Sequence, residues 1–224
     1  MSFGDKKLSE IAISVPGSTS LLREYDLDFC CGGSDTLAHA AAEKGLNVAE
    51  IETRLTELQN SKAENPEEYW VNATYPEIID HILVRYHQRH REQLQELIVL
   101  ADRVESVHGD REDCPMGVAA ELRNVYEDLS NHMMKEEHVL FPMIKAGNYM
   151  MAQMPIRMME MEHTEHGEHL EVLKSLTNNM TPPADACNTW LALYSGIQEF
   201  IDDLMMHIHR ENNILFPRVI AENH

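Results

Sequence analysis

Two stretches of the chain repeat one spacing of histidine, glutamate and a Leu-Phe-Pro tripeptide. In the first, His132 is followed four residues later by Glu136, and then by LFP at 140–142. In the second, His207 and Glu211 precede LFP at 215–217. Residues four apart lie on one face of an α-helix, so each pair can direct an imidazole nitrogen and a carboxylate oxygen at the same point. Such nitrogen and oxygen donors together are typical metal ligands.

A second pair of segments repeats at nearly the same distance. The stretch HQRHREQLQEL from His87 aligns without gaps to HTEHGEHLEVL from His163, with His, His, Glu, Leu and Leu at equivalent positions. The segments 77–146 and 153–221 therefore resemble two helical hairpins of common design. Each hairpin contains a helix with a single candidate histidine, followed by a helix with the His-x-x-x-Glu pair.

Helix geometry predicts that the repeated residues meet. With a rise of about 1.5 Å per residue, antiparallel packing brings His87 level with His132, and His163 level with His207. Four helices can then deliver six side chains to one layer of the core: His87, His132, Glu136, His163, His207 and Glu211. Four imidazoles and two carboxylates are too many for one tetrahedral zinc ion. They suit two metal ions bridged by the carboxylates, with open coordination positions, which favours redox-active iron.

A metal-free interpretation also exists for each part of this pattern. A single histidine on an apolar helix face is usually a hydrogen-bonded core or boundary residue, and His-x-x-x-Glu is common as a surface pair. The bundle would then be an interaction module without metal. Two copies in register, each with a matched preceding histidine, favour the dinuclear metal site, because burying these polar groups without metal would cost solvation energy.

The elements that must position these residues are four long amphipathic segments. Apolar residues recur at spacings of three and four over 77–107, 116–146, 155–177 and 183–221, which predicts an all-α, up-down-up-down four-helix bundle. Shorter helices are expected at 8–14, 18–24, 34–44 and 48–58, the third capped by Ser34. We therefore expect a small helical domain at 1–60, a linker at 61–76 and the bundle at 77–224. Pro142 and Pro217 fall inside helical segments, where a kink is expected.

Composition excludes several classes of protein. Lys and Arg total 18 against 38 Asp and Glu in 224 residues, so the net charge of −20 disfavours nucleic acid and anionic membranes as partners. Neither a signal-peptide apolar region nor an 18-residue apolar run occurs. Four cysteines, two of them adjacent, do not form a secreted disulfide framework, which indicates a reducing cytoplasm.

Several other residues are candidates for chemistry or for simple packing. Cys30 and Cys31 precede a predicted helix, whose dipole would lower a thiol pKa, so they could meet NO, iron or a partner's cluster. Alternatively, one cysteine is buried and the following glycines make the turn.

Glu162, beside His163, could support the site or guard an entry path. His166 could replace His163 or add a ligand, but its repeat mate His90 lies in a charged stretch, so both are expected on the bundle flank. Four further histidines, His81, His138, His169 and His209, are expected at the surface, and the methionine pairs in the core.

At these motifs the chain resembles the hemerythrin-like di-iron proteins, and among them the iron–sulfur cluster repair (repair of iron centres) family. The resemblance rests on YDLDFCCGG, RYHQRHREQL, SNHMMKEEHVLFPMI, EHTEHGEHLEVLK and IDDLMMHIHRENNILFPR, and it covers essentially the whole chain. It implies two iron ions held by the six residues named above, with Glu136 and Glu211 bridging.

The resemblance also implies a role under oxidative or nitrosative stress. Damaged iron–sulfur proteins would be the partners, repaired by iron delivery or by removal or reduction of NO, and a di-iron nitric oxide reductase activity is one expectation. Oxygen-carrying hemerythrins have a second histidine where this chain has Gly167, which argues against simple oxygen carriage. The alternative is a sensor that binds O2 or NO reversibly, or an iron store. Because adjacent cysteines rarely pair with each other, a homodimer bridged through them stays open.

Overall fold

The computed structural model describes residues 2–61 and 63–222, and within these ranges every regular element is helical. A single backbone bridge between Lys7 and Thr36 is the exception. The all-α prediction is confirmed. The chain divides into two compact units, one formed by residues up to Ile78 together with those from Ile208 onward, and the other by Ile79–His207.

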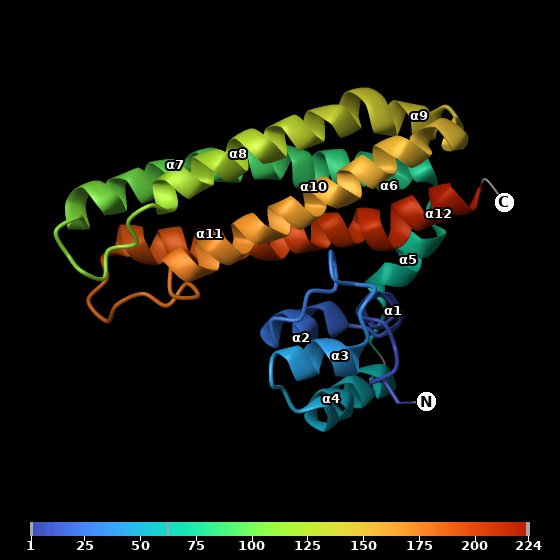
Figure 1. Ribbon diagram of the computed structural model, residues 1–224, viewed down its shortest axis with the longest axis horizontal. Coiled ribbons are helices and arrows are strands. Elements are labelled where there is room, and N and C mark those ends of the chain that lie inside the picture. The colour runs from blue at the N-terminus through green and yellow to red at the C-terminus, as the bar shows by residue number, and fades with distance from the viewer. Residues whose placement is uncertain (1, 62, 223–224) are drawn as a thin grey trace. The chain divides into compact units, whose positions relative to one another are not determined.

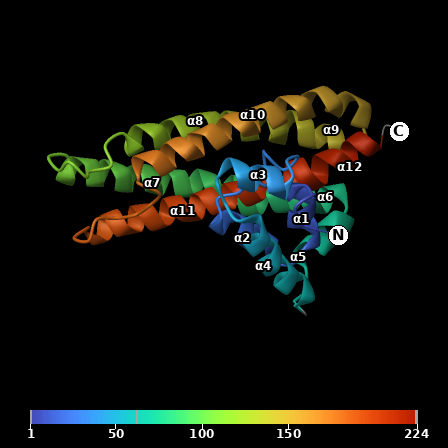
Figure 2. The same cartoon turned by 60° about the horizontal axis from the view of Figure 1, so that its bottom comes forward.

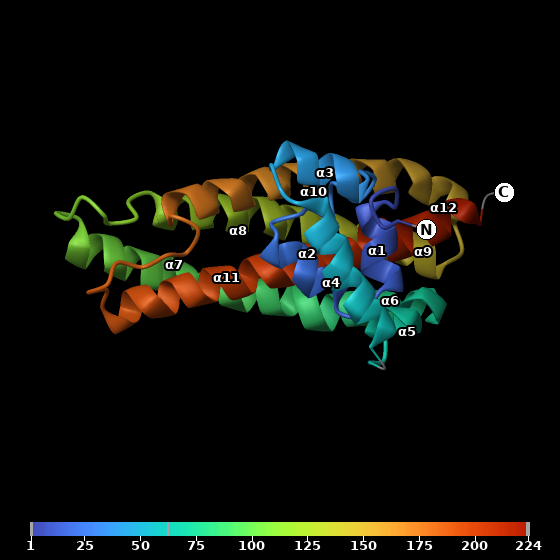
Figure 3. The ribbon, with the colours of Figure 1, turned by 90° about the horizontal axis from the view of Figure 1, so that it is seen from below.

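Four short helices form the N-terminal part of the first unit (Figure 3). They are α1 (Leu8–Ser14), α2 (Ser18–Glu24), α3 (Leu37–Glu43) and α4 (Val48–Asn60). The predicted cap of the third helix was wrong: the hydroxyl of Thr36, not of Ser34, accepts the backbone N–H of His39 at 3.3 Å, so α3 begins at Leu37. Leu8, Ile11, Leu22, Leu37, Ile51 and Leu55 are buried and make a small apolar core.

The segment 61–76, expected as a linker, contains a helix. Helix α5 (Pro66–Asn72) starts with proline at its first turn, and the side chain of Asn65 accepts the backbone N–H of Glu67 at 3.2 Å. Both features stabilise a helix N-terminus, because they deal with N–H groups that have no partner within the helix. Helix α6 (Tyr75–His81) follows directly and leads toward the bundle.

Long antiparallel helices make up the second unit (Figure 1). The π-helical segment η1 (Ile82–His87) leads into α7 (Gln88–His108), and α8 (Val118–Lys135) returns alongside it. Helix α8 continues through η2 (Glu136–Leu140) into α9 (Phe141–Lys145), and α10 (Tyr149–Leu176) then runs beside α8 (Figure 2). The last long helix, α11 (Asn188–His209), continues through η3 (Arg210–Leu215) into α12 (Phe216–Ala221), and the residues from Ile208 onward belong to the first unit. This is the predicted up-down-up-down order.

Apolar faces of these helices meet in a continuous core. Leu94 and Leu97 of α7, Leu122 and Val125 of α8, and Trp190 and Phe200 of α11 are at most 2% exposed. A Cβ atom at Gly196 would lie 2.7 Å from the Leu97 side chain, so glycine there permits close approach of α7 and α11. Burial of this kind is the main source of helix stability in such a bundle.

Helix α10 differs from its prediction in two respects. It begins at Tyr149 and carries Pro155 inside, rather than starting at that proline. The carbonyl group deprived of a partner belongs to exposed Met151, near the helix start, where solvent can satisfy it. The methionine pairs were expected in the core, but Met150, Met151 and Met158 of this helix are between 49% and 68% exposed. Met159 is the one methionine of this helix that is buried.

Pro142 and Pro217 each lie in the first turn of the short helix that follows a π-helical segment. Here the backbone N–H of Phe141 bonds to the carbonyl of Glu136, and that of Phe216 to the carbonyl of Glu211. These bonds span five residues instead of four, so each π turn ends directly before the proline. The LFP tripeptides thus mark the positions where the α-helical hydrogen-bond pattern is interrupted.

Candidate metal centre

All six residues of the predicted layer are buried together. His87, His132, Glu136, His163, His207 and Glu211 are each at most 1% exposed. They form two groups of four, each with ligand atoms within 4.8 Å of one another. One group contains His87 and His207, the other His132 and His163, and both contain Glu136 and Glu211. Glu211 follows His207 by one turn of the same unbroken helix, as Glu136 follows His132.

Imidazole nitrogens converge in two pairs. The Nε2 atoms of His87 and His207 are 3.2 Å apart, and those of His132 and His163 are 3.1 Å apart. A metal–nitrogen distance of about 2.1 Å would place two imidazole nitrogens on one ion roughly 3 Å apart. Each pair is therefore spaced as two ligands of a single ion would be.

The carboxylate of Glu136 lies between the two histidine pairs. Its Oε2 atom is 3.3 Å from Nε2 of His87 and 3.4 Å from Nε2 of His132. One oxygen therefore faces a member of each group almost equally. Two fully buried carboxylates need compensating positive charge, because an ionised group in a protein core loses its solvation. The donor set thus fits a pair of cations.

Outer carboxylates hold two of the imidazoles in orientation. Nδ1 of His87 lies 2.8 Å from Glu137, and Nδ1 of His132 lies 2.9 Å from Glu162. The hydrogen bond to the imidazole, with Arg91 or Lys135 adding positive charge, lowers the pKa of Glu137 and of Glu162 to about 2. Both carboxylates are therefore ionised at neutral pH, keep the proton on Nδ1 and leave Nε2 as the inward ligand atom.

Of the two outer carboxylates, only Glu162 was a candidate from the sequence. Glu162 was considered as support for the site because it adjoins His163, but it contacts His132 on the neighbouring helix instead. Glu137 was not identified. The sequence feature that could have identified Glu137 is the doubled glutamate in KEEH. Glu137 directly follows the candidate ligand Glu136 and contacts His87 on the preceding helix.

Three histidines assigned to the surface or flank are in fact buried. His90 and His209 are fully buried and His166 is only 4% exposed. The error has a simple cause for His90 and His166: residues three apart share a helix face, so each follows its inward-facing neighbour into the core despite the charged residues around it. His209 packs against Phe29 with ring centroids 5.4 Å apart. Of the other histidines, His138 is exposed as predicted.

The adjacent cysteines form a separate cluster with Asp28. The Asp28 carboxylate accepts the backbone N–H groups of Cys30, Cys31 and Gly32 at 2.9 to 3.0 Å, and Sγ of Cys30 lies 3.1 Å from the same side chain. The predicted lowering of the thiol pKa is wrong for Cys30. The hydrogen bond with the Cys31 thiol, burial and the Asp28 charge raise the pKa of Cys30 well above its usual value. Helix α3 begins six residues after Cys31, too far for its dipole to help.

Residues next to Glu211 hold the backbone of this cysteine loop. The amide of Asn213 donates to the carbonyl of Phe29 at 2.8 Å, and that of Asn212 donates to the carbonyl of Cys30 at 3.1 Å. Asn213 also lies 2.8 Å from Nδ1 of His209. The turn that presents Glu211 therefore contacts the cysteine loop with its outer face, a relationship that the sequence reasoning missed.

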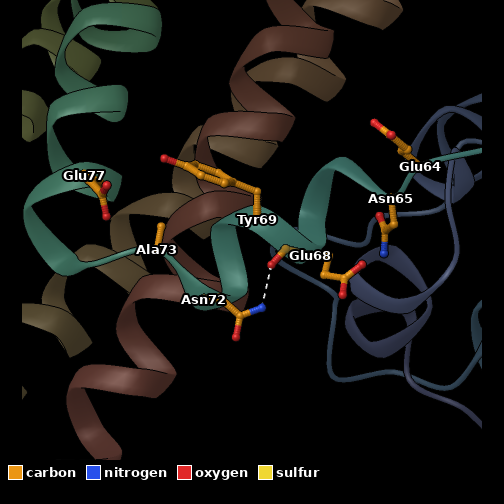
Figure 4. A pocket seen from close by; sticks show the side chains of 7 residues that line it. All are labelled: Glu64, Asn65, Glu68, Tyr69, Asn72, Ala73 and Glu77. Atoms are coloured by element: carbon orange, nitrogen blue, oxygen red, sulfur yellow. Dashed lines mark hydrogen bonds between the residues drawn. The ribbon is translucent and has the colours of Figure 1, made fainter.

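A shallow cavity of about 590 Å³ lies elsewhere, along α5 (Figure 4). Its lining is acidic and polar, with Glu64, Glu68, Asn72 and Glu77 beside Tyr69. The amide of Asn72 is engaged with the backbone carbonyl of Glu68 at 2.8 Å. This lining holds neither histidine nor cysteine, so the cavity is unrelated to the metal centre. Among the described helices, none has the length and apolar character needed to cross a bilayer.

Comparison with known proteins agrees with this geometry. Residues 78–219 match the hemerythrin HHE cation binding domain, and residues 4–59 match ScdA_N, described as a domain of unknown function. A probable iron–sulfur cluster repair protein of Haemophilus influenzae is 68% identical over 99% of this chain and its own full length. Iron–sulfur cluster repair proteins YtfE of Musicola paradisiaca and Escherichia coli are each 56% identical, over 98% and 99% of both chains. With its paired domains and its two buried groups sharing Glu136 and Glu211, the chain belongs to the YtfE family of iron–sulfur cluster repair proteins.

Proposed function

We propose that the two groups bind two iron ions. His87 and His207 would hold one, His132 and His163 the other, and Glu136 and Glu211 would bridge them. The observation that carries this proposal is the pair of Nε2–Nε2 distances near 3 Å on either side of a shared carboxylate. Mixed nitrogen and oxygen donors with positions left open favour iron over structural zinc.

Iron–sulfur cluster repair is the function of the family, and the centre provides the means for it. Iron bound there supplies a redox couple and open coordination positions. The protein's own side chains set the conditions: Glu137 and Glu162 orient two imidazoles, and the burial of all six residues excludes bulk water and large ligands. The clusters to be repaired would be those damaged by oxidative or nitrosative stress, through iron delivery or through removal or reduction of NO.

The N-terminal domain has the features of a contact or transfer module. Cys31 is partly exposed and Cys30 is buried beside it, with the two Sγ atoms 3.8 Å apart. With Asp28 they form a group whose ligand atoms could hold a metal ion. We assign this loop the passage of iron to, or contact with, a damaged iron–sulfur protein.

Complete burial of the centre also suits a second function, that of a sensor binding NO or O2 reversibly. Only small ligands could reach ions whose protein ligands are at most 1% exposed. This alternative differs from repair in its outcome: the ligand would leave unchanged.

Metal content is the first test. Protein purified or reconstituted without oxygen should hold about two irons per chain, and the double substitution Glu136→Ala with Glu211→Ala should remove most of it. Exposed Glu165→Ala is the matched control. Less than half an iron per chain after reconstitution of the wild type would refute the di-iron assignment.

Function is tested on the loaded protein. Supplying NO to the reduced form should yield N2O if NO is reduced, whereas reversible binding alone would support the sensor. Damaged [4Fe–4S] enzyme should regain activity with the wild type. Full repair by the double variant Cys30→Ala with Cys31→Ala would remove the role assigned to the thiols.

A further inference from the structure

Two buried imidazoles lie beside the six residues of the metal centre. His90 and His166 occupy equivalent positions of the internal repeat, three residues after His87 and His163. Their exposed fractions are 0% and 4%. Neither belongs to the two groups whose ligand atoms converge within 4.8 Å. They are thus buried with the site but stand outside its ligand set.

Within the described part of the chain, these two rings lack the hydrogen bonds expected of buried imidazoles. Both ring nitrogens of His90 and Nε2 of His166 have no partner there. An imidazole ring carries at least one N–H donor. Leaving such groups unmatched in a core is costly, so two occurrences at equivalent positions call for a ligand.

The direction of the helices places both rings on the same side of the centre. Helices α7 and α10 run parallel to each other, and α8 and α11 run the opposite way (Figure 1). Glu136 lies one helical turn after His132, and Glu211 lies one turn after His207. Both carboxylates are therefore displaced from the imidazoles toward the end of the bundle that contains Pro142. His90 and His166 lie about one turn along α7 and α10, toward the opposite end. The two carboxylates and the two extra imidazoles therefore flank the imidazole layer on opposite sides.

Each extra imidazole packs against a different metal group. The His90 ring lies 5.3 Å from that of His207, and the His166 ring lies 4.9 Å from that of His132, between centroids. Around His90 the rings of Tyr86 and Phe200 leave little room, with centroids at 6.1 and 5.4 Å. His166 borders a polar cavity of about 220 Å³. Packing this close around His90 would admit only a ligand of very few atoms.

We propose that His90 and His166 are positioning residues that hydrogen-bond a small ligand, such as NO or azide, on the side of the metal pair opposite Glu136 and Glu211. This rests on the proposed di-iron function. Each of the two imidazoles would serve one of the two groups, His90 the group with His207 and His166 the group with His132. The pseudo-symmetry of the repeat thus extends from the metal ligands to the groups that receive the substrate.

The test measures metal and ligand separately. The variants are His90→Leu and His166→Leu, which remove the donor, and His90→Gln and His166→Gln, which keep an amide donor. Exposed His138→Leu is the matched control. Iron per chain is determined first, then the azide dissociation constant by absorbance titration and the N–O stretching band of the NO adduct. We expect near-full iron in every variant, azide affinity lower by about threefold to tenfold in each Leu variant, and partial recovery with Gln. The N–O band should shift in the Leu variants only.

The outcomes separate the two levels of the proposal. A wild type without iron overturns the di-iron function, and the positioning role with it. Fully loaded Leu variants with unchanged azide affinity and an unchanged N–O band overturn the positioning role alone. Loss of iron from both the Leu and the Gln variants would make these residues ligands and also overturn it. Should the Leu variants fail to fold, the Gln variants decide through azide affinity, which must fall below that of the wild type because the amide replaces the imidazole donor only in part; wild-type affinity in both Gln variants would overturn the positioning role.

Discussion

Asn213, two residues after Glu211, donates its side-chain amide to the backbone carbonyl of Phe29, 184 residues earlier in the chain, at 2.8 Å. Asn212 does the same for Cys30 at 3.1 Å. One helical turn therefore carries the candidate ligand Glu211 on its inner face and holds the cysteine loop with its outer face. Both amides bond to the backbone of the loop that carries the two thiols.

Replacing both amides should release the cysteine loop. In Asn212→Ala with Asn213→Ala, the loss of two hydrogen bonds of about 1 kcal/mol each should raise the open fraction of the loop by at least tenfold. Hydrogen exchange at residues 29–33 and the alkylation rate of buried Cys30 measure this opening. Asn72→Ala, which removes a comparable amide–carbonyl bond on exposed α5, is the control. Unchanged exchange and alkylation in the double variant would show that other contacts hold the loop.

The outer carboxylates should control metal affinity without contacting metal. Glu137→Gln and Glu162→Gln remove the ionised partners of His87 and His132. Substitutions of this kind typically weaken metal binding about 10- to 100-fold, because the imidazole loses its fixed tautomer and orientation. Competition with a chelator measures the change, with exposed Glu165→Gln, from the same cavity as Glu162, as the control. Equal affinities in all three variants would leave the outer carboxylates without this role.

Removing one partner of a buried ion pair should strongly destabilise the protein. Glu67 is 5% exposed and Arg210 is 3% exposed, and the two side chains form a salt bridge while Arg210 also lies over the Trp70 ring. Glu67→Ala leaves the arginine buried without its partner, which should cost roughly 3–5 kcal/mol. Urea unfolding measures the loss, and Glu68→Ala, on the exposed side of the same helix, should change stability by less than about 0.5 kcal/mol. A loss below about 1 kcal/mol in Glu67→Ala would indicate that water reaches Arg210 and replaces the carboxylate.

Stability should depend on pH through His169. Burial alone would lower the pKa of this ring, but its hydrogen bonds and charge interactions with Glu121 and Asp128 outweigh burial and raise it above 6.5. A raised folded-state pKa stabilises fully below pH 6.5, and this contribution is lost as the pH rises through the folded value. The free-energy difference between wild type and His169→Gln should therefore be larger at pH 5.5 than at pH 9. A difference that grows toward alkaline pH would contradict the assignment.

The sequence was sufficient to predict the helices and the convergence of the six candidate ligands, because both follow from periodicity. Spacings of three and four locate the apolar faces, and the internal repeat brings His87, His132, His163 and His207 to one level. Helices α1 and α2 have the bounds predicted from their apolar and breaker residues. These are local properties, which a short window of residues determines.

Properties that depend on contacts between distant segments could not be predicted. The Asn213–Phe29 bond and the Glu67–Arg210 pair join residues more than 140 positions apart. The environment of Cys30 depends on Asp28 folding back over the loop, which reversed the expected direction of its pKa shift. The charged residues beside His90 indicated a surface position. His90 is nevertheless buried, because it lies three residues after His87 and therefore on the same inward helix face.

The π turns before Phe141 and Phe216 have a consequence for the phase of the helix. A π turn holds one residue more than an α turn, so each acts like a single-residue insertion and rotates the following segment by about 100°. Phe141 and Ile144 after the first turn, and Phe216 and Val219 after the second, are all buried in this rotated frame. If the same residues followed regular α-helical pitch, this rotation would be lost and the four apolar side chains would turn toward solvent. Each π turn therefore keeps the apolar residues that follow a bridging candidate directed into the core, and it lies at the same distance from the glutamate in both halves of the chain.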